Sequence, residues 1–145
     1  MQNTFHDDLS FGKKYEYKLL EMLGDWDTAE IGTDDDQDAN YDVKIIKDEE
    51  EATYEVKADR YGLKTGNFCI EYRNRNRPSG ILKSKANFYA IYLVDDSKED
   101  LYIIPLDVLK SSLYSNSFRT RQLGYMQRSS CMMIPVDVFI EYRVN

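Results

Sequence analysis

Apolar and polar residues alternate in the stretch YDVKIIKDEEEATYEVKAD, residues 41–59, as they do in a half-buried β-hairpin. Side chains alternate between the two faces of a strand, so Tyr41 and Val43 share one face of the first strand. Tyr54 and Val56 share one face of the second strand in the same way. The charged residues between them therefore fall together on the opposite face, and something must balance their charges.

The turn of this hairpin decides which charged residues face one another. If residues 48–51 form the turn, Asp42 lies across from Lys57 and Lys44 lies across from Glu55. Asp42 and Glu55 are then diagonal neighbours on one face, about 7–8 Å apart. Two acids this close repel each other unless a positive group lies between them. That group is either a divalent cation or the lysines themselves.

The rest of the chain predicts a compact order of helices and strands. Ser10 is an N-cap for a helix that runs to about Leu23 and is ended by Gly24, and an acidic connector leads from there to the hairpin. The later predicted elements are a strand at 67–74, a turn at 75–80, a short helix or helical turn at 81–86, strands at 87–94 and 101–106, a helix at 107–116 and an extended segment at 131–142. This order predicts an α/β or α+β fold on one mixed sheet, with residues 1–145 forming a single domain.

Composition narrows the class of protein. The hydrophobic content of 42% is typical of a globular chain, and no apolar run is long enough to span a bilayer. The chain begins with no segment like a signal peptide, so we expect a cytoplasmic protein with no membrane partner. Cys69 and Cys131 lack the spacing of metal ligands and are expected to be reduced thiols. The sole histidine, His6, lies in a polar stretch, which argues against histidine-based catalysis.

The net charge of −7 by itself argues against a nucleic-acid partner, but the distribution of charge reverses that conclusion. Residues 25–59 hold fourteen Asp or Glu and three Lys, whereas residues 60–85 hold seven Lys or Arg and one acid, Glu71. Such asymmetry indicates a polyanion site beside an acidic cation site. For the stretch YRNRNRPSG alone, a solvated basic loop is the alternative. A further basic group that would extend the patch consists of Arg119, Arg121 and Arg128.

The first predicted helix carries a charge on its apolar side. At about 100° per residue, Glu16 falls inside the broad arc formed by the apolar residues of this helix. A carboxylate there needs a partner, because an unpaired buried charge is unfavourable by several kcal/mol. Either Glu16 lies at the edge of the arc and pairs with a lysine, or it is a third carboxylate directed at the site of Asp42 and Glu55.

The acid Asp42, followed on the next strand by Glu55-Val56-Lys57, resembles the PD-(D/E)XK nuclease superfamily. That superfamily has the restriction-endonuclease-like fold, an αβββαβ core with a central mixed sheet, here followed by a C-terminal extension. Glu16 matches the additional acid of many members, including Holliday-junction resolvases. The run PSGILKSKANFYAIY is similar to a segment of small phage and bacterial members, and the whole resemblance covers residues 10–94. One departure is Tyr41, which stands where a proline often precedes the acid.

The resemblance implies a metal-dependent deoxyribonuclease, an endonuclease rather than an exonuclease. Asp42 and Glu55 would hold one or two Mg²⁺ ions together with the backbone carbonyl of Val56, and Mn²⁺ would substitute. Lys57 would orient or polarise the attacking water. Glu16 would bind the metal directly or through water.

The resemblance also implies contacts with DNA phosphates, which give affinity without reading the sequence. The residues expected to make them are Arg73, Arg75, Arg77, Lys83, Ser84 and Lys85. Glu71, on the strand at 67–74, is a further candidate for the acidic site. The resemblance to small phage enzymes implies that the protein acts in the cytoplasm of a host. A homodimer is one arrangement that nucleases of this size adopt.

Two other classes of function compete with a nuclease. One is a non-catalytic nucleic-acid-binding module of the same fold, which would be expected to have lost Asp42, Glu55 or Lys57, and none of these is missing. The other is a structural acidic domain that uses Asp34 to Asp38 as a phosphate-like run, against which the arginine-rich segment argues.

Overall fold

The computed structural model describes residues 4–32 and 41–145 and, within them, every side chain except those of residues 4–10 and Tyr125. Its helices and strands are α1 (Thr4–Leu23), β1 (Thr28–Ile31), β2 (Val43–Lys47), β3 (Glu50–Asp59), α2 (Gly62–Thr65), β4 (Asn67–Asn74), β5 (Arg77–Pro78), β6 (Phe88–Val94), β7 (Glu99–Pro105), α3 (Leu106–Tyr114), β8 (Arg119–Leu123) and β9 (Ser129–Pro135), with 3-10 helices η1 (Gly80–Leu82), η2 (Tyr125–Gln127) and η3 (Val136–Tyr142). Within the described part of the chain, none of the helices has the length and apolar character that a bilayer crossing requires. The acidic run Asp34 to Asp38 lies outside the described residues.

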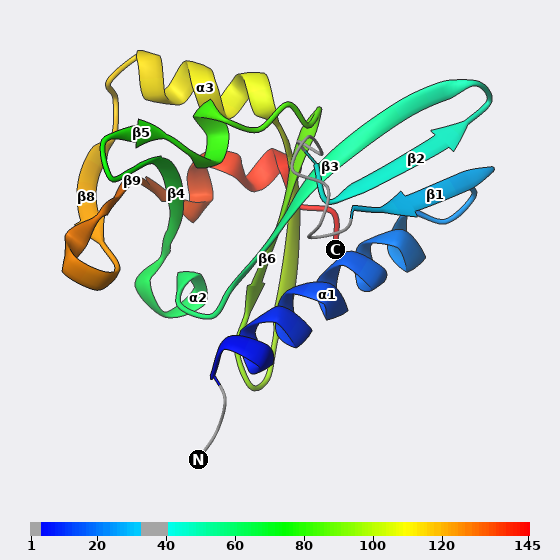
Figure 1. The fold of residues 1–145 in the computed structure, drawn as a ribbon, viewed down its shortest axis with the longest axis horizontal. Helices are drawn as coiled ribbons and strands as arrows, with labels where there is room; N and C mark the ends of the chain where they lie inside the picture. The colour runs from blue at the N-terminus through cyan, green and yellow to red at the C-terminus, as the bar shows by residue number, and fades with distance from the viewer. Residues whose placement is uncertain (1–3, 33–40) are drawn as a thin grey trace.

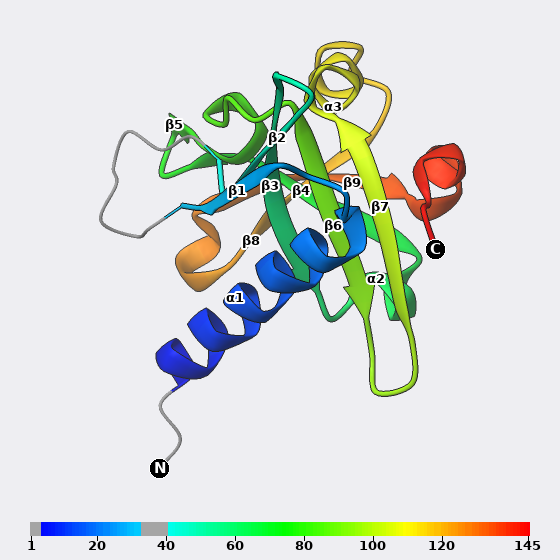
Figure 2. The ribbon, with the colours of Figure 1, turned by 90° about the vertical axis from the view of Figure 1, so that its right-hand side faces the viewer.

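A five-stranded mixed sheet in the order β1-β2-β3-β6-β7 forms the centre of the fold (Figure 1). Strands β1, β2 and β3 are antiparallel neighbours, β3 pairs with β6 in parallel, and β6 pairs with β7 in antiparallel fashion. Figure 2 shows α1 crossing one face of this sheet, where Tyr15 and Leu19 are buried. The predicted α+β class with a central mixed sheet is therefore confirmed.

A second sheet covers the opposite face of the central one. Its order is β5-β4-β9-β8, all antiparallel, and its apolar side chains pack against those of β6 and β7. Along β6, Tyr89 and Ile91 face this second sheet, whereas Ala90 and Tyr92 face α1. Since β6 is buried on both faces, its sequence is a continuous apolar run rather than an alternating one.

The strand at 67–74 forms as predicted, but it does not belong to the central sheet. It is β4, which pairs with β9 in the second sheet. The third antiparallel strand beside β2 and β3 is instead β1, a strand of four residues that lies within the predicted acidic connector. Local patterning identifies a strand, but its partner depends on residues far along the chain. The predicted start of the first helix at Ser10 is also wrong, because α1 begins at Thr4, although it ends as predicted before Gly24, whose φ of +48° is left-handed.

The C-terminal third holds two further differences. The segment at 131–142 was expected to be extended throughout, but β9 ends at Pro135 and η3 follows. Proline has no backbone N–H to donate to a ladder, so the strand stops there. Strand β8 was not predicted, because its sequence RTRQL shows no apolar alternation. The predicted helix at 107–116 is confirmed as α3.

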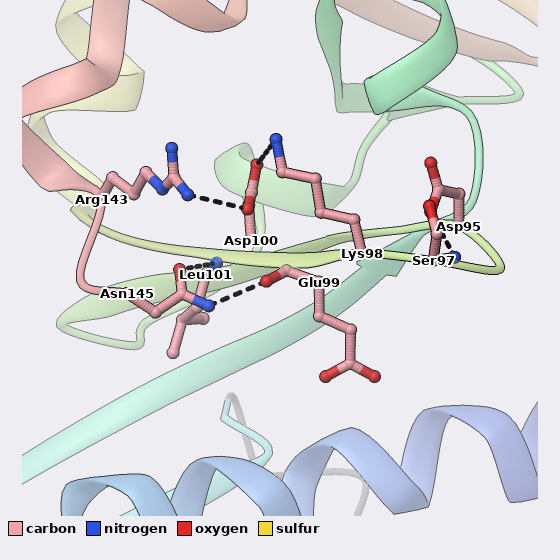
Figure 3. Close-up of polar contacts among 8 residues, drawn as sticks. All are labelled: Asp95, Ser97, Lys98, Glu99, Asp100, Leu101, Arg143 and Asn145. Carbon is pink, nitrogen blue, oxygen red and sulfur yellow. Dashed lines mark hydrogen bonds and ion pairs between the residues drawn. The ribbon is translucent and has the colours of Figure 1, made fainter.

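The outer edge of β7 is covered by the C-terminal residues (Figure 3). The Val144 N–H donates to the Leu101 carbonyl at 2.9 Å, and the Asn145 side chain accepts from the Leu101 N–H at 2.7 Å and donates to the Glu99 carbonyl at 2.9 Å. Asp100 is buried beside them and pairs with Lys98 and Arg143. The unpaired groups of an edge strand invite pairing with another chain, so this cover protects the sheet.

Candidate active site

The turn between β2 and β3 contains two residues, not the four that were predicted. Lys47 pairs with Glu50, so Asp48 and Glu49 alone form the loop. Their φ angles are +51° and +67°, the left-handed values of the turns that match strand twist in two-residue hairpins. Asp-Glu lacks the glycine typical of this turn, which is why the pattern of the sequence favoured a longer loop.

The shorter turn shifts every cross-strand pair by two residues. Val43 pairs with Tyr54, and the Asp42 N–H donates to the carbonyl of the same Tyr54 at 2.9 Å, so Asp42 lies across from the Tyr54–Glu55 part of β3. The expected pair of Asp42 with Lys57 is therefore wrong. Because side chains alternate with a period of two, a shift of two leaves each side chain on its predicted face.

Lys44 is not the counter-charge of Glu55, contrary to expectation. It pairs across the hairpin with Thr53, and its Nζ lies 3.2 Å from Glu51 Oε1 and 3.3 Å from Glu30 Oε2. Hydrogen bonds to these two carboxylates raise the pKa of Lys44 above its usual range. This lysine is therefore engaged away from the two acids of the site.

Asp42 is held at the end of β2 by the strand it faces. Its Oδ2 accepts a hydrogen bond from the Val56 N–H at 2.8 Å, and its own N–H donates to the Tyr54 carbonyl at 2.9 Å. The carboxylate is thus tied to the backbone of β3 immediately after Glu55. This bond fixes the orientation of the Asp42 carboxylate, which lines the pocket described below.

Glu55 has the most perturbed carboxyl group of the site. Its side chain is 20% exposed, and burial together with the nearby Asp42 carboxylate raises its pKa to about 7. Lys57 Nζ at 3.6 Å from Oε1 and the Ser84 hydroxyl at 3.5 Å from Oε2 act in the opposite direction but are both distant. A carboxyl group in a pocket whose pKa is strongly perturbed by burial and by a neighbouring charge is a candidate for a functional role.

A pocket of about 200 Å³ opens at these acids. The residues that line it are Tyr41, Asp42, Glu55, Lys57, Glu71, Gly80, Lys83 and Ser84. They come from the β2–β3 hairpin, from β4 and from the η1 segment. The structure therefore brings Asp42, Glu55, Lys57, Lys83 and Ser84 together, with Glu71 among them.

Gly80 allows the η1 segment to approach β4 this closely. Its φ is +50°, and a Cβ at this position would overlap the Glu71 carbonyl. The Ser84 N–H in turn donates to the Gly80 carbonyl at 2.9 Å, which places Ser84 against Glu55. Because Gly80 has no side chain, the segment 80–84, which carries Ser84, can pack against β4 at Glu71.

Glu16 lies beside this pocket rather than in its lining. Its side chain, 12% exposed, forms an ion pair with Lys13 at 3.2 Å. Lys13 Nζ also donates to the Gly32 carbonyl at 3.1 Å, and the Gly32 N–H donates to the Asp42 carbonyl at 2.7 Å. Glu16 is therefore connected to Asp42 through Lys13 and the backbone of Gly32.

Five of the six arginines in the two groups of the sequence lie on the strands of one sheet or in a turn between them, and Arg128 lies between η2 and β9. Arg73 is on β4, Arg77 is on β5 and Arg75 is in the turn between them, while Arg119 and Arg121 are on β8. All five are exposed, and none of them lines the acidic pocket. Lys85 is likewise exposed and outside the lining. These basic residues therefore lie outside the lining of the pocket, whose own cations are Lys57 and Lys83.

Tyr89 does not line the acidic pocket but lies near its carboxylates, and the sequence did not reveal it. Its hydroxyl is buried and has no hydrogen-bond partner among the residues that the structure describes. Burial and the charges of Glu55, Asp42 and Glu71 raise the pKa of this hydroxyl. Tyr89 lies in the apolar run of β6, where nothing distinguishes it from the core tyrosines around it.

Within the described residues, no cluster of three or more His, Cys, Asp or Glu side chains forms a ready metal site. The oxygen donors of the pocket are the paired carboxylates Asp42 and Glu55, with Glu71 facing the same space. Mg²⁺ is commonly bound by one or two carboxylates and several waters, so this donor set fits such an ion.

Comparison with known proteins gives one relevant likeness. No family model and no curated protein matches the chain. Among solved structures, the bacterial homing endonuclease I-Ssp6803I is similar, with a TM-score of 0.55, 19% identity, and coverage of 92% of this chain and 84% of that one. This chain shares its fold with an endonuclease. At this identity the likeness shows the fold and leaves the chemistry to be argued from the site.

Proposed function

We propose that the chain is a metal-dependent endonuclease of the PD-(D/E)XK superfamily that hydrolyses phosphodiester bonds in DNA. The observation that supports this most is the meeting of Asp42, Glu55 and Lys57 in one pocket. They meet on the hairpin of a central sheet whose fold is similar to that of an endonuclease.

The acid pair suits a divalent cation. Burial and Asp42 raise the pKa of Glu55 to about 7, so two ionised carboxylates are unfavourable there without a counter-charge. Asp42, Glu55 and the Val56 carbonyl would hold Mg²⁺, or Mn²⁺ in its place. A bound metal would supply Lewis acidity and a nucleophilic water at neutral pH.

The other residues of the pocket have roles that follow from their chemistry. Lys57 would orient a water beside Glu55, and Lys83 and Ser84, which line the same pocket, would bind the phosphate that enters it. Glu71 is a candidate third acid. Glu16 acts as an outer carboxylate, either through water on the metal or by positioning the strand of Asp42.

Incubation with supercoiled plasmid tests this proposal directly. Nicking with Mg²⁺ or Mn²⁺, and none with EDTA, is the expected result. The variant Lys57→Ala should lower the rate by about 10²- to 10⁴-fold while DNA binding stays nearly intact. Lys47→Ala, in the same hairpin but paired with Asp25, is the matched control and should keep full activity. An intact plasmid with folded protein would favour the alternative, a non-catalytic DNA-binding module.

DNA affinity should come from different residues. Replacing Arg73, Arg75 and Arg77 by alanine should weaken binding to all sequences and flatten its salt dependence, by about 0.9 in slope for each phosphate that an arginine no longer neutralises. Binding isotherms at two salt concentrations measure this. An unchanged slope would make these arginines a solvated loop and direct the search to Arg119, Arg121 and Arg128. Sedimentation with and without DNA decides whether two copies assemble.

A further inference from the structure

A cleft of about 830 Å³ lies directly beside the acidic pocket and shares Lys57, Glu71 and Gly80 with it. One wall is formed by α1 at Phe11 and by the second half of β3, and the other by the second sheet at β4 and β8. These elements can be followed in Figure 1, where the two sheets diverge on either side of α2. Whatever occupies this cleft reaches the acids of the pocket.

The interior of the cleft is apolar. Its floor reaches the core residues Ile70, Tyr89 and Ile91, and its far wall carries Leu123 and Met133. Surfaces that bind duplex DNA are polar and strongly positive, because they meet phosphates. An apolar interior instead suits nucleobases, which are flat and largely apolar on their faces.

The rim of the cleft is cationic. Arg60, Arg121 and Lys57 lie around it, and the guanidinium of Arg60 lies 3.8 Å from the centre of the Phe11 ring. Two acids also line the cleft: Glu71, which it shares with the acidic pocket, and Asp59, one oxygen of which accepts from the backbone N–H groups of residues 61 and 62 at 2.7 and 2.9 Å. Positive charge at the rim and an apolar interior match a nucleic-acid strand whose phosphates lie at the rim and whose bases point into the cleft.

Tyr61 stands in this lining with its side chain 72% exposed. An exposed aromatic ring beside arginines is the combination by which proteins bind unpaired nucleic acid, with the bases stacked on the ring.

We propose that this cleft holds unpaired nucleotides next to the phosphate that the acidic pocket cleaves. Its volume lies in the range of pockets that enclose a small ligand, which is enough for a few nucleotides and too small for a duplex. The substrate is therefore single-stranded DNA, or DNA with an unpaired segment at the cut. This inference rests on the proposed function for the cleavage step, but not for the binding of bases.

Binding and crosslinking in EDTA test the cleft without any chemistry. Three oligonucleotides of the same sequence carry one 5-iodouracil, in a single strand, in a continuous duplex, and in an unpaired bulge of a duplex. By anisotropy we expect the single strand and the bulge to bind roughly tenfold more tightly than the duplex. Ultraviolet crosslinks, mapped by mass spectrometry, should fall on Phe11 or Tyr61.

Two tyrosines of equal exposure form a matched pair of variants. Tyr61→Ala should weaken binding of the single strand by about fivefold or more, the size expected for one stacked base, and should remove the crosslink at that position. Tyr114→Ala, at the end of α3 and also 72% exposed, should change neither. Equal losses in both variants, or crosslinks outside the cleft, would overturn the inference.

The same oligonucleotides with Mg²⁺ or Mn²⁺ separate the two proposals. Crosslinks in the cleft without cleavage would overturn the nuclease and retain the cleft as a site for unpaired nucleotides. Cleavage of the continuous duplex as fast as of the bulge, without crosslinks in the cleft, would retain the nuclease and assign the cleft to another occupant, such as a protein segment or a second copy. Cleavage at the bulge with crosslinks at Tyr61 supports both.

Discussion

One buried and one half-buried carboxylate in the central sheet have opposite surroundings. Asp100, on β7, has a side chain 6% exposed and lies 3.2 Å from Lys98 and 3.1 Å from Arg143 (Figure 3). Glu55, on β3, faces another acid, Asp42, and has Lys57 at 3.6 Å.

The contrast separates a charge that is neutralised within the fold from one for which we propose a function. At the β7 edge the cations neutralise a charge that helps to hold the C-terminus in place. At the β2–β3 hairpin the arrangement leaves repulsion unrelieved, and a folded protein tolerates that where a ligand will relieve it. Each region can therefore be disrupted with a different expected loss.

The largest effect is expected from Glu55→Gln. Removing one proposed metal ligand should lose several kcal/mol of transition-state stabilisation, which is a fall of about a thousandfold in single-turnover cleavage. The free energy of unfolding should stay equal or rise, because the repulsion with Asp42 is removed. Cleavage that continues at the normal rate would show that Glu55 is not a ligand.

Asp100→Asn should give the opposite pattern. Its loss leaves Lys98 and Arg143 without their carboxylate, but both cations are partly exposed and regain water. We expect the free energy of unfolding in urea to fall by about 1–2 kcal/mol, with cleavage per folded molecule unchanged. A loss of cleavage without a loss of stability would contradict the structural role of Asp100.

The pH dependence of stability in EDTA should distinguish the same two groups. The pKa of Glu55 is raised from its ordinary 4.5 to about 7. Between these two pH values the folded protein keeps the Glu55 proton, whereas the unfolded chain has released it. The free energy of unfolding should therefore fall as pH rises from about 4.5 to 7, by roughly 3 kcal/mol at most. Subtracting the curve of Glu55→Gln isolates this fall. Asp100→Asn should retain it, and a flat difference curve would show that Glu55 titrates normally.

The smallest effect is expected from Tyr89→Phe. Its hydroxyl has no partner among the described residues, so its removal should leave the free energy of unfolding unchanged or raise it by up to about 1 kcal/mol. Cleavage should fall by about tenfold if the hydroxyl bonds to substrate or water in the site. Tyr92→Phe, on the same strand but facing α1, is the control and should not alter cleavage. Equal rates in both variants would remove Tyr89 from the site.

The hairpin shows how far the sequence reaches and where it stops. Alternation placed Asp42 and Glu55 on one face, and that holds because a shift of two residues preserves the face. The register itself was wrong, since it depends on a turn whose Asp-Glu sequence is atypical. The prediction that strand 67–74 belongs to the one mixed sheet was wrong for a related reason, because its partner β9 lies far along the chain. Tyr89 could not be found, because only tertiary packing turns one core tyrosine toward three carboxylates.

Gly80 also bears on when the protein becomes active as it folds. The two acids come from a hairpin of neighbouring strands, which forms early and locally. The wall that carries Ser84 fits only against β4, at Glu71, and β4 is held in place by its distant partner β9. Pairing of this range is slow because a long loop must close first. We therefore expect a partly folded chain to hold its acids together without a phosphate-binding wall, so that DNA cleavage begins only once the second sheet has assembled.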